Sequence, residues 1–182
     1  HEDENLYYRA EVTHSQTLND GSLIGYSGVS TFTSSANVLV TNFMKALGYG
    51  AQNTYNRYCY EEASPVANLF LNLKYMIDRE PIVKENAYFD TVYTSGDVRL
   101  LENNAYLPLG FLADVQLTNV DFSKPGNAFQ FQDKLLSAAT GIQSAVWNII
   151  PRDRIVVTSE DVDITPRGGA GYCAYEATSA GT

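Results

Sequence analysis

One segment, Ser64–Asp78, constrains the fold of this chain more than any other. Ser64 followed by Pro65 is a typical helix start: the serine hydroxyl caps a free N–H, and proline in the first turn loses no hydrogen bond. The pattern predicts a short helix over about Val66–Leu71 that runs directly into a strand over Leu73–Ile77. This segment therefore places a helix and a buried strand next to each other.

Alternation within that strand predicts which of its faces is buried. Leu73, Tyr75 and Ile77 point to one side of an extended chain, and Lys74 and Met76 point to the other. The first set is the more apolar, so we expect it to face the core.

The other elements follow from periodicity and turn residues. Apolar residues at helical spacing predict a helix over Ala36–Leu47, with Ser34 or Ser35 as its cap and Gly48 at its end. Tyr106–Val115 is predicted as an edge or bulged strand, because Pro108 lacks a backbone donor. Strands at Tyr88–Thr94 and Val98–Glu102 flank Ser95-Gly96-Asp97, which is predicted as a hairpin turn. The remaining predictions are strands at Tyr7–Thr13, Arg154–Ser159 and Tyr172–Tyr175, an ordered loop at Leu23–Thr33, and a helix at Phe129–Ala139 ending at Gly141.

This order of elements predicts an α+β fold, with a mixed or antiparallel sheet and two to three helices packed on it. We place one α+β domain over residues 1–150 and a C-terminal extension over residues 151–182. Whether that extension starts a truncated β-rich unit stays open at this point. The chain begins at His1 without an initiator methionine, which is expected of a processed product or an excised fragment.

Charge and hydropathy exclude several classes of function. The net charge is −9, and the lysines and arginines are scattered, so no basic stripe is present to follow a nucleic-acid backbone. No apolar run reaches the 18 residues that a spanning helix needs. Cys59 and Cys173 are far apart in sequence, and they form either a disulfide or two isolated thiols.

The sequence contains no convincing catalytic or metal-binding motif. A serine triad would have to use His14, and the segment Gly25–Gly28 lacks the spacing of a nucleophile elbow. The acidic run Glu160–Asp163 is either a solvated loop or a calcium site, and we favour the loop. Arg167–Gly171 lacks a following helix to hold phosphate, so it is predicted as a flexible glycine-rich loop. We expect no catalytic residue, metal or cofactor.

Four residues remain as candidates for ligand binding. Tyr26, Ser27 and Ser30 belong to a loop rich in glycine and serine that contains an aromatic ring, and such loops often face ligands. Arg57 stands among tyrosines, where it can stack on or hydrogen-bond a sugar or phosphate. The competing interpretation of Arg57 is an ion pair with Glu61 or Glu62.

Several short segments form a pattern through their order and spacing: Tyr8-Arg9, Tyr26–Ser30, Phe32–Ser35, Leu47–Tyr49, Ser64–Val66, Leu73–Ile77, Leu101–Asn103, Leu107–Phe111, Asn127–Phe129 with Gln132 and Leu135, and Thr140-Gly141. In this pattern the chain resembles the large extracytoplasmic domain of the YfhO family of bacterial multi-spanning membrane proteins. The resemblance covers roughly residues 7–145, with small departures: Leu73 stands where valine is usual, and Asn103 is followed by a second asparagine.

The resemblance implies a membrane glycosyltransferase-like parent that transfers a sugar from a polyprenyl-phosphate carrier to a cell-envelope polymer such as lipoteichoic acid. It places this segment on the extracytoplasmic face of the bacterial membrane, with the catalytic carboxylates in the transmembrane part. The segment itself is then an accessory or acceptor-positioning domain without catalysis. Its expected partners are that transmembrane part and envelope glycan. The loop at Tyr26–Ser35 would either contact the glycan or rest against the transmembrane part. The competing function is a non-enzymatic extracellular carbohydrate-binding or adhesion module.

Overall fold

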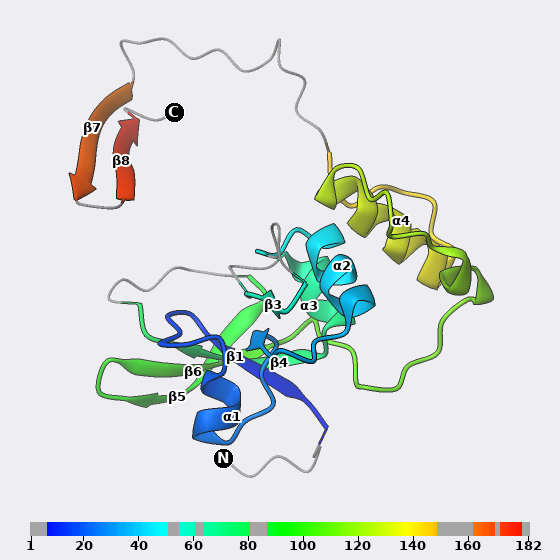
Figure 1. Cartoon of the computed structure of the whole chain (residues 1–182), viewed down its shortest axis with the longest axis horizontal. Helices are drawn as coiled ribbons and strands as arrows, with labels where there is room; N and C mark the ends of the chain where they lie inside the picture. The colour runs from blue at the N-terminus through cyan, green and yellow to red at the C-terminus, as the bar shows by residue number, and fades with distance from the viewer. Residues whose placement is uncertain are drawn as a thin grey trace. The chain divides into compact units, whose positions relative to one another are not determined.

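The computed structural model describes residues 7–50, 55–60, 64–80, 87–148, 162–169 and 172–179, the last two ranges by their backbone only. It divides into two compact units, residues 1–147 and 148–182, each considered by itself below (Figure 1). The predicted calcium site, the strand at Arg154–Ser159 and the acidic pair Glu61-Glu62 lie at least partly outside the described residues.

The first unit is built on a four-stranded mixed sheet with the order β1-β4-β6-β5. Its strands are β1 (Arg9–Val12), β4 (Leu73–Asp78), β5 (Phe89–Ser95) and β6 (Val98–Asn103). β1 and β4 are parallel, whereas β4 with β6 and β6 with β5 are antiparallel. In Figure 1 the β5–β6 hairpin extends to one side of the sheet, away from α4. This sheet and its helices confirm the α+β class.

The helices of the first unit are α1 (Asp20–Ile24), α2 (Val38–Ala46), α3 (Pro65–Phe70) and α4 (Ala128–Thr140), with a 3₁₀ turn η1 at Val115–Asn119. α2, α3 and α4 supply the core with Met44, Ala67, Phe131 and Leu135, which pack with Leu73 and Met76 of β4. A second small sheet pairs β2 (Thr31–Phe32) with β3 (Arg57–Tyr58).

Local signals located most of these elements. Ser64 caps α3 by accepting a hydrogen bond from Ala67 N at 3.1 Å, as predicted. Gly96 occupies the turn between β5 and β6 with φ of 57°, and Gly141 ends α4 with φ of 74°. Both conformations favour glycine because it has no Cβ to clash with the backbone.

Four predictions about local structure were wrong. Asn37, not Ser34 or Ser35, caps α2. The predicted loop at Leu23–Thr33 contains the end of α1 and the strand β2. Tyr106–Val115 forms no strand, because β6 ends at Asn103 and Pro108 cannot donate to a ladder. In the second unit, Arg167–Gly169 belongs to β7 (Val162–Gly169), which pairs antiparallel with β8 (Tyr172–Ser179), so this stretch is not a loop.

Both faces of β4 are buried, whereas the sequence predicted one. Lys74 is 8% exposed, and its Nζ lies 5.2 to 6.0 Å from the ring centroids of Tyr8, Tyr75 and Tyr106. Glu102 Oε1 is 3.6 Å from the same nitrogen. The faces of nearby tyrosine rings and a carboxylate compensate for the water that the ammonium loses, so a lysine can lie in this position.

Candidate functional site

The structure brings the two parts of the predicted ligand site close together through the small β2–β3 sheet. Phe32 in β2 pairs with Arg57 in β3, and Ser30 lies directly before β2. The Ser30 hydroxyl accepts a hydrogen bond from Tyr60 N at 2.9 Å, which joins the loop to the end of the β3 segment. The Ser30 side chain therefore has a structural contact that a ligand would have to replace.

Tyr26 and Ser27 differ in what they offer a ligand. Ser27 is exposed, and its carbonyl accepts a hydrogen bond from Ala10 N at 2.9 Å. The Tyr26 hydroxyl is buried and has no hydrogen-bond partner in the described part of the chain. Burial, then the negative charges of Glu11 and Asp20, raise the pKa of Tyr26 to about 12, so its hydroxyl stays protonated at neutral pH.

A buried carboxylate that the sequence analysis did not single out holds this loop in place. Glu11 in β1 is buried, and one of its oxygens accepts hydrogen bonds from Val29 N at 2.9 Å and Ser30 N at 2.8 Å. Its other oxygen accepts one from Val12 N at 3.2 Å. The sequence feature that could have identified this residue is an acidic side chain within a predicted strand. If such a strand is buried, the carboxylate needs hydrogen-bond partners, because a buried charge without them is costly.

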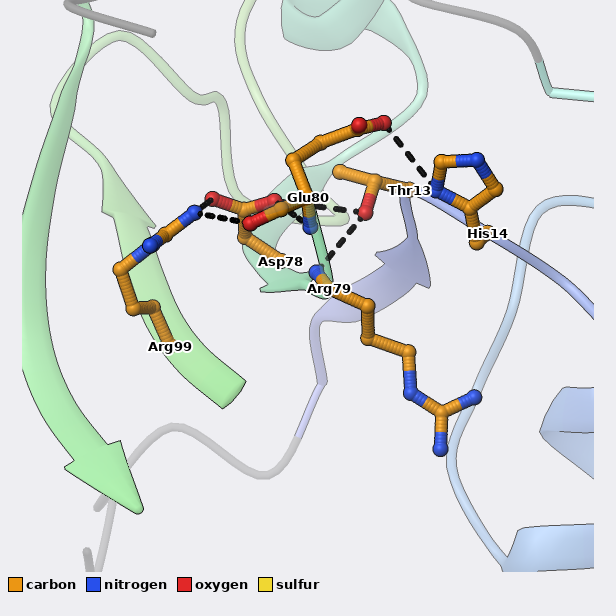
Figure 2. A network of polar contacts seen from close by, with 6 residues as sticks. All are labelled: Thr13, His14, Asp78, Arg79, Glu80 and Arg99. Carbon is orange, nitrogen blue, oxygen red and sulfur yellow. Dashed lines mark hydrogen bonds and ion pairs between the residues drawn. The ribbon is translucent and has the colours of Figure 1, made fainter. Parts of the chain in front are cut away.

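A second polar cluster lies where β1 and β4 end, and Figure 2 shows its six residues. Arg99 in β6 donates from Nε and Nη2 to Asp78 Oδ2 at 2.9 and 2.6 Å, and Nη2 also donates to the Glu80 carbonyl at 2.8 Å. Asp78 further accepts from Glu80 N at 2.9 Å and from the Thr13 hydroxyl at 3.3 Å. We call these residues, with His14 and Arg79, the strand-end cluster.

The charge state of Asp78 follows from these contacts. Burial alone would raise its pKa, but the Glu80 N–H and the Arg99 guanidinium stabilise the carboxylate, and the net effect lowers the pKa of Asp78. Asp78 is therefore ionised at neutral pH and fully engaged with its neighbours. Its contacts connect β1, β4 and β6 and leave it little capacity to act on a substrate.

Arg79 and His14 form the outer part of the cluster. The Arg79 guanidinium is exposed and donates no hydrogen bond within the described residues, and in Figure 2 it points away from the Asp78–Arg99 pair. Its charge helps to lower the pKa of Asp20, for which the Thr17 hydroxyl is the main cause, and it also acts on Tyr26. His14 Nδ1 lies 3.1 Å from Glu80 Oε1.

The chemistry available at this surface is recognition by donors rather than proton transfer by acids. The carboxylates of Glu11, Asp20 and Asp78 already accept hydrogen bonds from neighbouring groups. Arg79 retains the planar donor array that suits phosphate or neighbouring hydroxyls. Within the described residues, no group of three His, Cys, Asp or Glu side chains is placed to hold a metal ion. The predicted alternatives for Cys59 and Cys173 lie partly outside the described side chains, because β8, which contains Cys173, is described by its backbone.

The chain is similar to one described family. A sequence model of the family described as "Bacterial membrane protein YfhO" matches residues 1–163. Neither the curated proteins nor the solved structures include a significant match to this chain. None of the helices in the described ranges has both the length and the apolar character required to cross a bilayer.

Proposed function

The chain belongs to the YfhO family of bacterial membrane proteins, and on that basis we propose that it is the extracytoplasmic accessory domain of a glycosyltransferase-like protein. In this proposal the domain positions an acceptor polymer of the cell envelope, such as lipoteichoic acid. The sugar-transfer step takes place in the transmembrane part of the same protein, which is the domain's main partner.

The observation that supports the acceptor-positioning role is the exposed guanidinium of Arg79, whose positive charge acts on Tyr26 in the predicted ligand loop. A phosphodiester of a teichoic-acid backbone has oxygens that match the donors of arginine, and its polyol hydroxyls can meet exposed groups such as Ser27. The neighbouring acids are occupied by structural contacts, which supports binding without catalysis.

Net charge limits how strong such binding can be. At −9, the chain repels a polyanion at distances up to about one Debye length, roughly 8 Å at physiological salt. Contact is therefore local and weak, which suits a polymer that must move past the site after each transfer. A neutral glycan would not face this repulsion, and this keeps the carbohydrate-binding module as the second candidate.

An NMR titration of the 182-residue chain with glycerol-phosphate oligomers tests the proposal. We expect shifts of the amide signals of Tyr26–Ser30 and of the Arg79 Nε–H. The variant Arg79→Gln should lose most of these shifts, whereas Arg57→Gln, in the other predicted part of the site, should retain them. Absence of any shift in these signals at millimolar oligomer would rule out acceptor positioning by this surface.

The same titration with neutral oligosaccharides separates the two candidate functions. Shifts that appear with a neutral sugar, centre on exposed tyrosines such as Tyr55 and Tyr93 and survive Arg79→Gln would favour the carbohydrate-binding module. Shifts that require the phosphate group would favour the teichoic-acid acceptor.

A further inference from the structure

An apolar loop projects from the first unit between β6 and η1. We call residues 108–113 the apolar loop; their sequence is Pro-Leu-Gly-Phe-Leu-Ala, with no charged or hydrogen-bonding side chain. Leu109 is 60% exposed, Phe111 36% and Leu112 104%, so Leu112 is as open as in an extended peptide. A cluster of exposed apolar side chains on one loop is unusual for a surface that meets only water.

The loop is held outward by contacts at both of its ends. At the start, the Leu107 carbonyl accepts a hydrogen bond from the buried Asn72 side chain at 2.7 Å. At the end, Asp114 N donates to the Ala139 carbonyl of α4 at 2.9 Å. In between, the ring of Phe111 packs edge-on against Phe70 of α3, with centroids 6.0 Å apart. The leucines therefore stay exposed although the loop has a defined conformation.

We propose that the apolar loop inserts into the interfacial region of a phospholipid bilayer. The chain belongs to a family of membrane proteins, so a membrane surface is a partner that it can meet. A convex loop needs no matching pocket in a fluid bilayer, whereas a rigid protein partner would have to supply one. An apolar tip with a partly exposed aromatic ring suits this depth.

Charge argues for lipid contact through apolar groups rather than through headgroup attraction. The chain has a net charge of −9, so anionic headgroups repel it. The nearest charged residue after the loop is Asp114, which caps η1 by accepting a hydrogen bond from Gln116 N at 2.8 Å. Because a charge is costly below the headgroups, Asp114 marks the limit of insertion. This inference does not depend on the proposed binding of an acceptor polymer.

A fluorescent label on the loop tests the proposal. Leu112→Cys, in a chain with Cys59→Ser and Cys173→Ser, carries an environment-sensitive nitrobenzoxadiazole dye. The full chain is attached to phosphatidylcholine vesicles by an N-terminal His tag and a nickel-chelating lipid, so weak insertion is still populated. We expect a blue shift, brighter emission and quenching by doxyl-labelled lipid. A label at Asp97→Cys, on the hairpin that extends away from α4 in Figure 1, should show none of these changes.

A variant and a lipid series sharpen the test. Leu109→Asp, with the label still at position 112, should lower the inserted fraction about tenfold, which corresponds to losing roughly one partly buried leucine. Leu109→Ser is a second variant without a charge, for the case in which the aspartate perturbs the loop, and it should also lower the inserted fraction. Circular dichroism checks that both variants fold. Replacing part of the phosphatidylcholine by phosphatidylglycerol should reduce the response, because the chain is acidic.

Three outcomes would overturn the proposal. The labels at positions 112 and 97 could respond alike, or doxyl lipid could fail to quench position 112. A dye response without vesicles that grows with protein concentration would instead assign the loop to a contact between two copies of the chain. The polymer titration contains no lipid, so failure of insertion and failure of acceptor binding are distinguished.

Discussion

At the scale of single residues, the molecule is organised by charged side chains that are buried with partners. The side chains of Asp78 and Arg99 are 9% and 14% exposed, and they meet at 2.6 Å. Glu11 is satisfied by backbone N–H groups and Lys74 by rings and a carboxylate. Removing one member of such a set leaves the other charge without water and without a partner, which costs more than an exposed pair is worth.

Arg99→Met should therefore be strongly destabilising. We expect the free energy of unfolding to fall by about 3 kcal/mol, the lower end of the range for a buried pair that loses one partner. Urea denaturation at pH 7 measures this. The matched control is Arg79→Met, an exposed arginine in the same cluster, which should stay within about 0.5 kcal/mol of the parent. Equal losses from the two variants would contradict the structural role given to Arg99.

The lowered pKa of Asp78 predicts how stability depends on pH. In the unfolded chain this carboxyl titrates near pH 3.9, and in the folded chain it titrates lower. The unfolded state therefore takes up protons first as pH falls, so the stabilisation is complete above about pH 4 and is lost below it. The urea concentration at the midpoint of unfolding should therefore decrease as the pH is lowered below about 4. Asp78→Asn, less stable at pH 7, should show a smaller decrease as the pH is lowered.

At the scale of elements, Ser64 joins two helices rather than only starting one. Its hydroxyl caps α3 at Ala67 N and also donates to Gln132 Oε1 of α4 at 2.6 Å. Gln132 is buried, and its Nε2 donates to the Leu47 carbonyl at the end of α2, at 2.9 Å. The ends or sides of three helices thus meet around one glutamine, which aligns them over the sheet.

Two N-cap substitutions separate these roles of Ser64. Asn127→Ala removes the exposed cap of α4, a hydrogen bond from Phe129 N at 2.8 Å, and should cost about 1 kcal/mol. Ser64→Ala should cost about 2 kcal/mol, because it removes a cap and also leaves the buried Gln132 oxygen unsatisfied. Thermal or urea denaturation measures both. If the two losses were the same, the contact between Ser64 and Gln132 would contribute nothing.

At the scale of the whole first unit, one core connects the sheet to three helices. Phe131 of α4 is 2% exposed and packs edge-on to Phe43 of α2, with centroids 6.2 Å apart. The same core cluster includes Leu73 and Met76 of β4. Elements that share a core of this kind are expected to unfold together.

A pair of phenylalanines on α4 tests that cooperativity. Phe131→Leu should destabilise the unit by about 1–2 kcal/mol. The midpoint of unfolding should decrease by the same amount whether unfolding is followed by Trp147 fluorescence or by circular dichroism. Phe129 is 50% exposed, and its ring lies tilted against that of Trp147 with centroids 5.0 Å apart, so Phe129→Leu should cost about 1 kcal/mol at most. Transitions of Phe131→Leu that separate between the two probes would show that α4 unfolds independently of the sheet.

The candidate site shows how far sequence reasoning reached. The loop at Tyr26–Ser30 and Arg57 were chosen for their composition, and whether they bind a ligand stays a prediction. The strand-end cluster was missed because its members, from Thr13 to Arg99, are scattered along the chain and each is ordinary in its local context. Only the parallel pairing of β1 with β4 brings Thr13 next to Asp78.

The sequence by itself determined the features that depend on near neighbours. These are the start of α3 at Ser64-Pro65, the hairpin turn at Gly96, the end of α4 at Gly141 and the α+β class. Caps, turns and periodicity are interactions within a few residues, so they can be recognised in the sequence.

The tertiary structure alone decided which distant residues meet. It buried Lys74 among tyrosines, turned Glu11 towards the loop at Val29, and left the segment around Leu112 as an exposed loop where a strand was expected. The physical reason is that burial is a property of the packed chain. Local periodicity reports which face of a strand is more apolar, but not whether a second layer covers the other face.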